Sequence, residues 1–172
     1  MQDPRKRGFT LIELLVVIAI IGILATLAVF AVSSARVRAR DAKRVADIKQ
    51  IQSSLDLYAV DKIGYPAQGL AGEGGPAALI IGGTQAECLD ADGFGSACPQ
   101  ATGNLIYMAT VPNNPTPGGR DYSYEGEDCV GSEVCNDYTI IFELEAETSE
   151  LRDVDEDGVT LCEAKSSGMK CD

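Results

Sequence analysis

The chain has 172 residues, a formal net charge of −12 and six cysteines, and it contains neither histidine nor tryptophan. Without histidine, a serine–histidine catalytic triad, a cysteine–histidine nucleophile pair and a histidine-ligated zinc site are excluded. Basic residues crowd the N-terminal part and acidic residues dominate the remainder, so the general surface of the C-terminal part would repel nucleic acid. The length favours one compact domain with an appendage.

The N-terminal part consists of a charged stub, residues 1–8, followed by an apolar run, residues 9–32. Only Thr10, Glu13 and Thr26 are polar within those 24 positions. A helix of this length rises about 36 Å, enough to cross a hydrocarbon core of about 30 Å. The run is longer than the roughly 7 to 15 apolar residues of a secretory signal peptide. The sequence therefore predicts a transmembrane or filament-core helix.

Glu13 is the one charged residue inside this apolar run. Placing an acid in hydrocarbon costs about 2–3 kcal/mol or more unless it is paired. Because the run contains no basic residue, a cation supplied by another subunit is one interpretation. The alternative is a carboxylate near the membrane interface that is protonated or reaches out to water.

Gly8, the sequence Phe9–Glu13 and the apolar helix that follows resemble the prepilin signature of type IV pilins and type II secretion pseudopilins. The resemblance covers residues 5 to about 35. It implies that a prepilin peptidase cuts after Gly8 and methylates the new N-terminal residue, Phe9. It also implies that Glu13 pairs with the N-terminal amine of a neighbouring protomer during assembly.

A cluster of basic residues follows the apolar run. By charge count alone the cytoplasm would lie on this side of the membrane, but long domains cross membranes largely regardless of charge, and the cysteines require the opposite orientation. The cluster has three interpretations: pairing with acidic neighbours or anionic lipid, a solvated helix face, or DNA binding. Its members are Arg36, Arg38, Arg40, Lys43 and Arg44.

Residues 33–63 are predicted to continue the helix as an amphipathic segment, so that one helix runs from about Phe9 to about Lys62. The stretch 33–62 contains neither glycine nor proline, and Gly64 and Pro66 are expected to end it. Apolar residues recur in it at spacings of three and four, which is typical of a helix with one buried stripe. They are Val45, Ile48, Ile51 or Gln52, Leu55 and Tyr58.

Residues 64–172 are predicted to form the globular head. Residues 64–83 are rich in glycine and favour a loop region, while residues 121–125 and 138–144 have the alternation and β-branched content of strands. We expect an antiparallel sheet of three or four short strands packed on the helix. The fold class is therefore α+β, and the resemblance implies the same pilin-like head.

All six cysteines lie in the head, and their even number indicates a disulfide framework formed in an oxidising compartment. The alternative is free thiols in a cytosolic protein. Six cysteines allow about 15 connectivities, and sequential pairing is favoured because each bond closes a short polar loop. The expected pairs are Cys88 with Cys98, Cys129 with Cys135 across a hairpin, and Cys162 with Cys171.

Residues 153–158 match the first half of an EF-hand calcium loop. The pattern then requires a glutamate where Ala164 stands, and the nearest acid, Glu163, comes one residue early. A structural Ca²⁺ site and a plain acidic turn both stay open. The resemblance adds that major pseudopilins carry calcium near the C-terminal end of their heads. The expected ligands are Asp153, Asp155, Asp157 and Glu163, and a shorter acidic motif lies at residues 90–93.

Together these features predict a structural protein with no active site and no organic cofactor. The resemblance implies a pilin that sits in the cytoplasmic membrane with its head outside and is then assembled by pilus or secretion machinery into an extracellular helical homo-oligomer. One alternative is a major pseudopilin of a type II secretion or DNA-uptake machine. Another is a membrane-anchored binding protein that does not polymerise.

Overall fold

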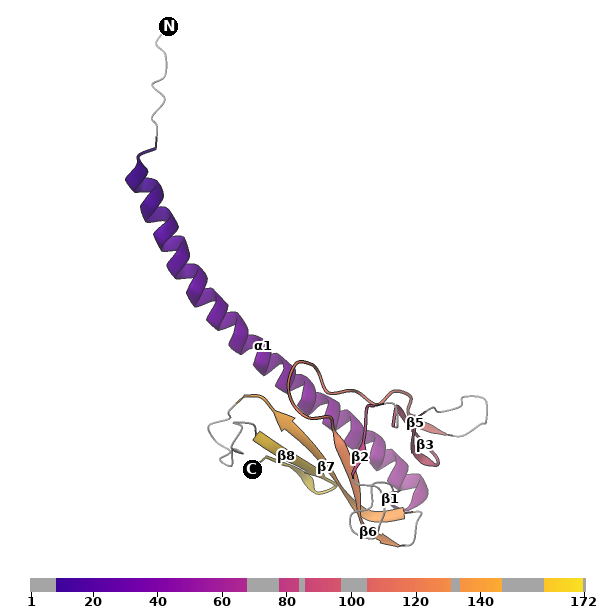
Figure 1. The fold of residues 1–172 in the computed structure, drawn as a ribbon. Helices are drawn as coiled ribbons and strands as arrows, with labels where there is room; N and C mark the ends of the chain where they lie inside the picture. The colour runs from indigo at the N-terminus through magenta and orange to yellow at the C-terminus, as the bar shows by residue number, and fades with distance from the viewer. Residues whose placement is uncertain are drawn as a thin grey trace. The chain divides into compact units, whose positions relative to one another are not determined.

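A computed structural model of the chain describes residues 9–67, 78–83, 86–96, 105–130, 134–146 and 160–171. These residues form one long helix and antiparallel strands, an α+β, pilin-like arrangement that confirms the predicted fold class (Figure 1). In chain order the elements are α1 (Leu11–Lys62), β1 (Tyr65–Pro66), β2 (Leu79–Ile80), β3 (Cys88–Asp90), β4 (Gly93–Gly95), β5 (Ile106–Met108), β6 (Ser123–Val130), β7 (Val134–Leu144), β8 (Thr160–Lys165) and β9 (Gly168–Cys171).

Helix α1 is continuous over 52 residues, as predicted, and begins two residues later than expected. The described residues fall into two compact units divided between Val37 and Arg38, and α1 contributes to both. The helix ends where Ile63 adopts a left-handed backbone conformation with φ of 59°, while its N–H still donates to the carbonyl of Ala59 at 2.9 Å. The chain can then turn into β1 at once.

The larger sheet has the strand order β2-β6-β7-β8-β9, with β1 paired to a further part of β7. All of its pairings are antiparallel, and the β6–β7 hairpin places Tyr124 opposite Ile140. The two strands predicted from sequence are confirmed as β6 and β7, both longer than expected.

The expected single sheet of three or four strands is wrong. The described residues form a six-stranded sheet and a second sheet of three strands in the order β4-β3-β5. Of the strands that the sequence did not indicate, β8 has six residues, and β1 to β5 and β9 have only two to four residues each. Runs this short show no clear alternation in a sequence, because alternation needs at least four residues to be distinguished from chance.

The core of the head unit lies between α1 and one face of the larger sheet. Ile51 and Leu55 of α1 are fully buried with Ile140 of β7, which confirms the predicted apolar stripe. Phe94 of β4 contacts Tyr124 of β6 edge to face, with ring centroids 5.0 Å apart. This ring contact joins the smaller sheet to the same core.

Two of the three predicted disulfides are present among the described residues. Cys129 and Cys135 close the β6–β7 hairpin, and Cys162 and Cys171 join β8 to β9. Cys88 is also disulfide-bonded. Its expected partner, residue 98, lies outside the described residues.

Candidate functional site

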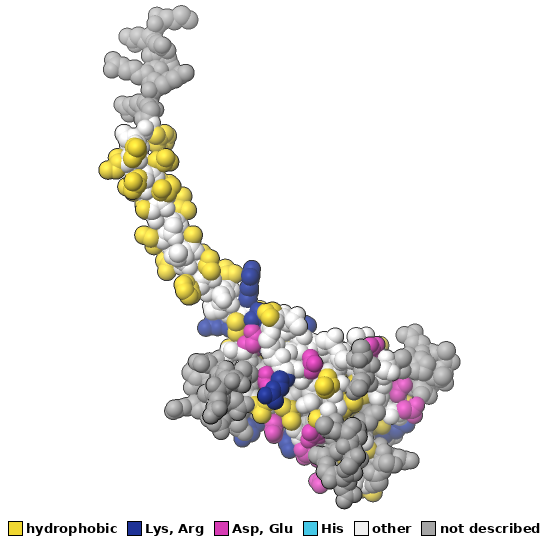
Figure 2. All heavy atoms as spheres, viewed as in Figure 1, with side chains coloured by type: hydrophobic (Ala, Val, Ile, Leu, Met, Phe, Trp, Pro, Cys, Tyr) yellow, Lys and Arg dark blue, Asp and Glu magenta, His cyan; other side chains and the backbone are white. Residues whose placement is uncertain are grey.

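The N-terminal half of α1 exposes apolar side chains on all sides, as Figure 2 shows for the face in view. Phe9 is 92% exposed, and the large apolar residues from Leu11 to Val32 are each about half exposed or more. By length and composition the helix is able to cross a membrane. Apolar surface of this extent needs lipid or the helices of other subunits to cover it.

Thr10 and Glu13 form a capping box at the start of α1. The Thr10 N–H and hydroxyl donate to Oε2 of Glu13 at 2.9 and 2.8 Å, and the Glu13 N–H donates back to the Thr10 hydroxyl at 3.3 Å. This reciprocal pattern satisfies donors that the first turn of a helix otherwise leaves unpaired. Among the described residues, Thr10 is the one hydrogen-bond partner of the Glu13 side chain.

The predicted assembly residues are therefore partly brought together. Phe9 lies next in the chain to Thr10, which holds the carboxylate of Glu13. Gly8 lies outside the described residues. Sequence reasoning overlooked Thr10, although a threonine three residues before a glutamate at the start of an apolar run is a known capping signal.

A second polar site, the Arg44 cluster (Arg40, Asp41, Arg44 and Glu145), fixes α1 to the head. The guanidinium of Arg44 is fully buried and donates to Asp41 Oδ1 at 2.6 Å and to Glu145 Oε1 at 2.5 Å. It also donates to Asn114 Oδ1 at 2.7 Å and to two backbone carbonyls in residues 115–118. Each of the three nitrogens of this buried guanidinium thus donates to at least one acceptor.

The other members complete the cluster. Arg40 forms an ion pair with Glu145, and Asp41 accepts hydrogen bonds from the backbone N–H groups of Glu145 and Ala146 at 2.9 and 2.8 Å. Hydrogen bonding from Arg40, reinforced by Arg44, outweighs the desolvation of the carboxyl and lowers the pKa of Glu145 to about 2. Glu145 is therefore ionised throughout the physiological range.

The Arg44 cluster corrects the sequence interpretation of the basic residues. From the sequence all five are expected to face outward, toward neighbours, lipid, solvent or DNA, but Arg40 and Arg44 face the protein's own head. Their acidic partner lies 105 and 101 residues away in the chain. No spacing rule along a helix could have indicated it.

The acidic motifs give no metal site among the described residues. Residues 153–158 lie outside them, and Glu163 is an exposed residue of β8 whose neighbour across the ladder is Lys170. At the shorter motif, Asp90 Oδ1 accepts the N–H of Asp92 at 2.9 Å in the turn between β3 and β4. A local turn of this kind explains that motif without an ion.

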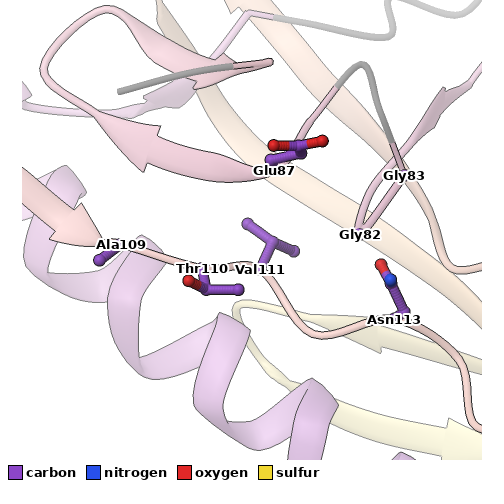
Figure 3. Close-up of a pocket in the computed structure, with 7 residues that line it drawn as sticks. All are labelled: Gly82, Gly83, Glu87, Ala109, Thr110, Val111 and Asn113. Carbon is purple, nitrogen blue, oxygen red and sulfur yellow. The ribbon is translucent and has the colours of Figure 1, made fainter. Parts of the chain in front are cut away.

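A pocket of about 320 Å³ lies where the chain after β2 meets the start of β3 and the segment after β5 (Figure 3). Gly82 has φ of 79°, and a Cβ there would lie 2.3 Å from the carbonyl oxygen of Pro112, so the close approach requires glycine. The polar side chains that line the pocket, those of Glu87, Thr110 and Asn113, are exposed. They form no nucleophile–base pair, and we assign this pocket no chemistry.

Comparison with known proteins first gives the class. Residues 3–29 match the family model of the prokaryotic N-terminal methylation motif, which contains the Thr10–Glu13 turn and most of the apolar run. The chain thus carries a prokaryotic N-terminal methylation motif. No solved structure shows a significant match to the chain.

The relatives then give the family. The chain is 38% identical over 111 residues to the type II secretion system core protein G of Pectobacterium carotovorum subsp. carotovorum, covering 63% of this chain and 69% of that protein. It is 34% identical over 122 residues to that of Pseudomonas aeruginosa, covering 68% and 82%. For the Escherichia coli relative, 44% identity spans 68 residues, 38% of this chain and 47% of that protein. The chain belongs to the family of type II secretion system core protein G.

Proposed function

We propose that the chain is the major pseudopilin of a type II secretion machine, a subunit of a short filament retained in the cell envelope. The similarity to core protein G relatives is the observation that carries this proposal. It favours the pseudopilin over the extracellular pilus that the sequence analysis placed first. The exposed apolar half of α1 supports assembly, because neighbouring helices would cover it.

In the proposed function the chain acts mechanically, as a filament subunit that assembles through its N-terminal helix. Hydrolysis of the Gly8–Phe9 bond frees the amine of Phe9, which then receives a methyl group from a methyl donor and stays protonated, and the Glu13 carboxylate of a neighbouring subunit pairs with that cation. Because an unpaired charge is costly in hydrocarbon, this pairing favours the assembled state over the isolated subunit in the membrane. The head carries no part of this chemistry and supplies the outer surface of the filament.

The first test is the mass of the N-terminal peptide in envelope and sheared surface fractions. We expect a chain that begins at methylated Phe9 and is retained in the envelope. The same processed chain in the sheared fraction would instead support a surface pilus. An intact Met1 terminus would contradict processing and support an anchored binding protein.

The second test replaces Glu13 by glutamine. We expect normal cleavage and membrane insertion, with loss of the multimers that chemical cross-linking detects in the wild type. Thr26→Val is the matched control, because Thr26 also lies in the apolar run and its hydroxyl bonds only the carbonyl of Ile23 within α1 among the described residues. Multimers that persist in Glu13→Gln would contradict the assembly role.

We also propose that residues 153–157 bind a structural Ca²⁺. The alternating carboxylates in the sequence support it. A chelator should then lower the unfolding free energy by about 2.7 kcal/mol if Ca²⁺ was present at a hundredfold excess over its Kd. Asp155→Ala, which removes the ligand oxygens, should abolish this response, whereas Asp92→Ala should preserve it. The reverse result would place the ion at the β3–β4 turn, and no response in the wild type would leave a plain acidic turn.

A further inference from the structure

The structure separates the basic cluster into residues that face the protein and residues that face outward. Arg40 and Arg44 share the carboxylate of Glu145. Arg36 and Arg38 are exposed, and neither forms an ion pair with any described residue. Within the part of the chain that the structure describes, these two guanidinium groups therefore have no acidic partner.

No acid on the helix can neutralise these two arginines. Residues 14–40 contain no aspartate or glutamate. The nearest acid, Asp41, lies three residues after Arg38, but its carboxylate already binds Arg44 Nη1 at 2.6 Å and the N–H of Glu145 at 2.9 Å. Diverting it would leave the buried guanidinium of Arg44 without one of its two carboxylates, which is unfavourable.

Counted from the end of the apolar run, Arg36 lies within the thickness of a lipid headgroup layer and Arg38 lies just beyond it. Val32 ends the run, so Arg36 lies about 6 Å and Arg38 about 9 Å further along the helix axis. The polar layer on each side of a bilayer is about 5–8 Å thick, from the difference between its total and hydrocarbon thickness. Arginine side chains are long enough to adjust their heads to this layer.

The two side chains also leave the helix in different directions. At about 100° per residue, positions 36 and 38 are separated by about 200° around the axis. They cannot grip one small anion together, but they can reach lipids on opposite sides of the helix. A belt of headgroups fits this arrangement better than a single soluble ligand.

We propose that Arg36 and Arg38 bind the phosphates of anionic phospholipids where α1 leaves the membrane. A planar guanidinium offers paired N–H donors that match phosphate oxygens. The proposal rests on membrane insertion of α1 in the proposed function and adds a determinant of how deeply the unassembled subunit sits. During assembly the two arginines must exchange these phosphates for other partners.

The test uses the full mature chain in detergent micelles with equimolar phosphatidylglycerol and phosphatidylcholine. Native mass spectrometry measures the ratio of the two lipids retained by the protein. We expect the wild type to retain phosphatidylglycerol preferentially, and Arg36→Gln with Arg38→Gln to reduce the preference about 5-fold for each arginine. Replacement of both by lysine should keep much of the preference, because the charge remains.

The matched control removes two exposed lysines from the same helix, Lys49→Gln with Lys62→Gln, far beyond the headgroup layer. It should retain the wild-type lipid ratio. An unchanged ratio in the arginine variant would overturn the proposal, and if that variant also lost cross-linked multimers, the partner would be the acidic head of a second copy. Failure of the wild type to float with lipid vesicles would overturn the proposed membrane insertion as well.

Discussion

The hydroxyl of Thr10 has two roles at the first turn of α1. It donates to the Glu13 carboxylate and accepts the Glu13 N–H. The carboxylate is thereby kept at the N-terminal end of the helix, where the helix dipole favours a negative charge. It also stays within a few residues of Phe9, where processing would create an amine.

Replacing Thr10 by alanine should loosen this first turn. Loss of an N-cap costs about 0.5–2 kcal/mol, so amide exchange of residues in the first turn should become about 2- to 30-fold faster. Hydrogen exchange of the chain in micelles, followed by NMR, measures it. Thr10→Ser keeps the hydroxyl and should exchange as the wild type does. Equal rates in Thr10→Ala and the wild type would show that the capping box is not formed.

Glu145 should make the stability of the head depend on pH. Its pKa is lowered to about 2 in the folded protein, so its contribution is present above the ordinary glutamate pKa of about 4.3 and is lost as the pH falls toward 2. Glu145→Gln should lower the unfolding free energy at neutral pH by about 1.5–3 kcal/mol. In urea unfolding, the difference between variant and wild type should shrink as the pH falls from about 4.3 to 2.

The control for this prediction is Glu143→Gln. The side chain of Glu143 is only 11% exposed and pairs with Arg120 at 2.8 Å, but the arginine side chain is 79% exposed, so water screens this pair. Exposed ion pairs contribute about 0–1 kcal/mol. If Glu143→Gln destabilised the head as much as Glu145→Gln does, general surface charge rather than the Arg44 cluster would explain the effect.

At the scale of elements, α1 combines an apolar half with a half that has one buried stripe. Leu55 is fully buried against the sheet, whereas Leu57 is 60% exposed. Leu55→Ala should lower the unfolding free energy by about 2–5 kcal/mol because it leaves a cavity. Leu57→Ala should change it by no more than about 0.5 kcal/mol. Urea unfolding of both variants checks the assigned face of the helix.

Long elements could be predicted from the sequence and short ones could not. The long stretch before Gly64 is recognisable as a helix, and the β-branched run of β7 is recognisable as a strand, from length and composition. Strands such as β1 and β2 have two residues each, which are too few to specify a strand. They form because a neighbouring strand is present for them to pair with. The second sheet was missed for the same reason.

The polar sites divide in the same way. The Thr10–Glu13 capping box is local, and the sequence contains its signal, a threonine three residues before a glutamate. The Arg44 cluster joins residues about a hundred positions apart, so only the folded chain identifies Glu145 as the partner. A hydrogen bond between residues close together in the chain can be predicted from the sequence. A partner that only the fold brings close cannot.

At the scale of the whole molecule, reducing the disulfides should affect one unit only. Both described bonds lie in the head, and each closes a short loop worth about 2–3 kcal/mol of unfolding free energy. Treatment with a reductant should therefore lower the thermal midpoint of the head in near-ultraviolet circular dichroism. Amide protection of residues 11–37 in micelles should be unchanged. Equal loss in both units would show that they unfold together.

Glu145 lies 105 residues after Arg40 in the chain. During synthesis it is therefore made well after the arginine with which it pairs. At about 5–20 residues per second, synthesis of that interval takes about 5–20 s. Throughout it, Arg40 and Arg44 have no carboxylate from the head, and Asp41 of the same helix is the one carboxylate of the Arg44 cluster that has already been made. The closing of the head onto α1 is thus a late event that only a nearly finished polypeptide can complete.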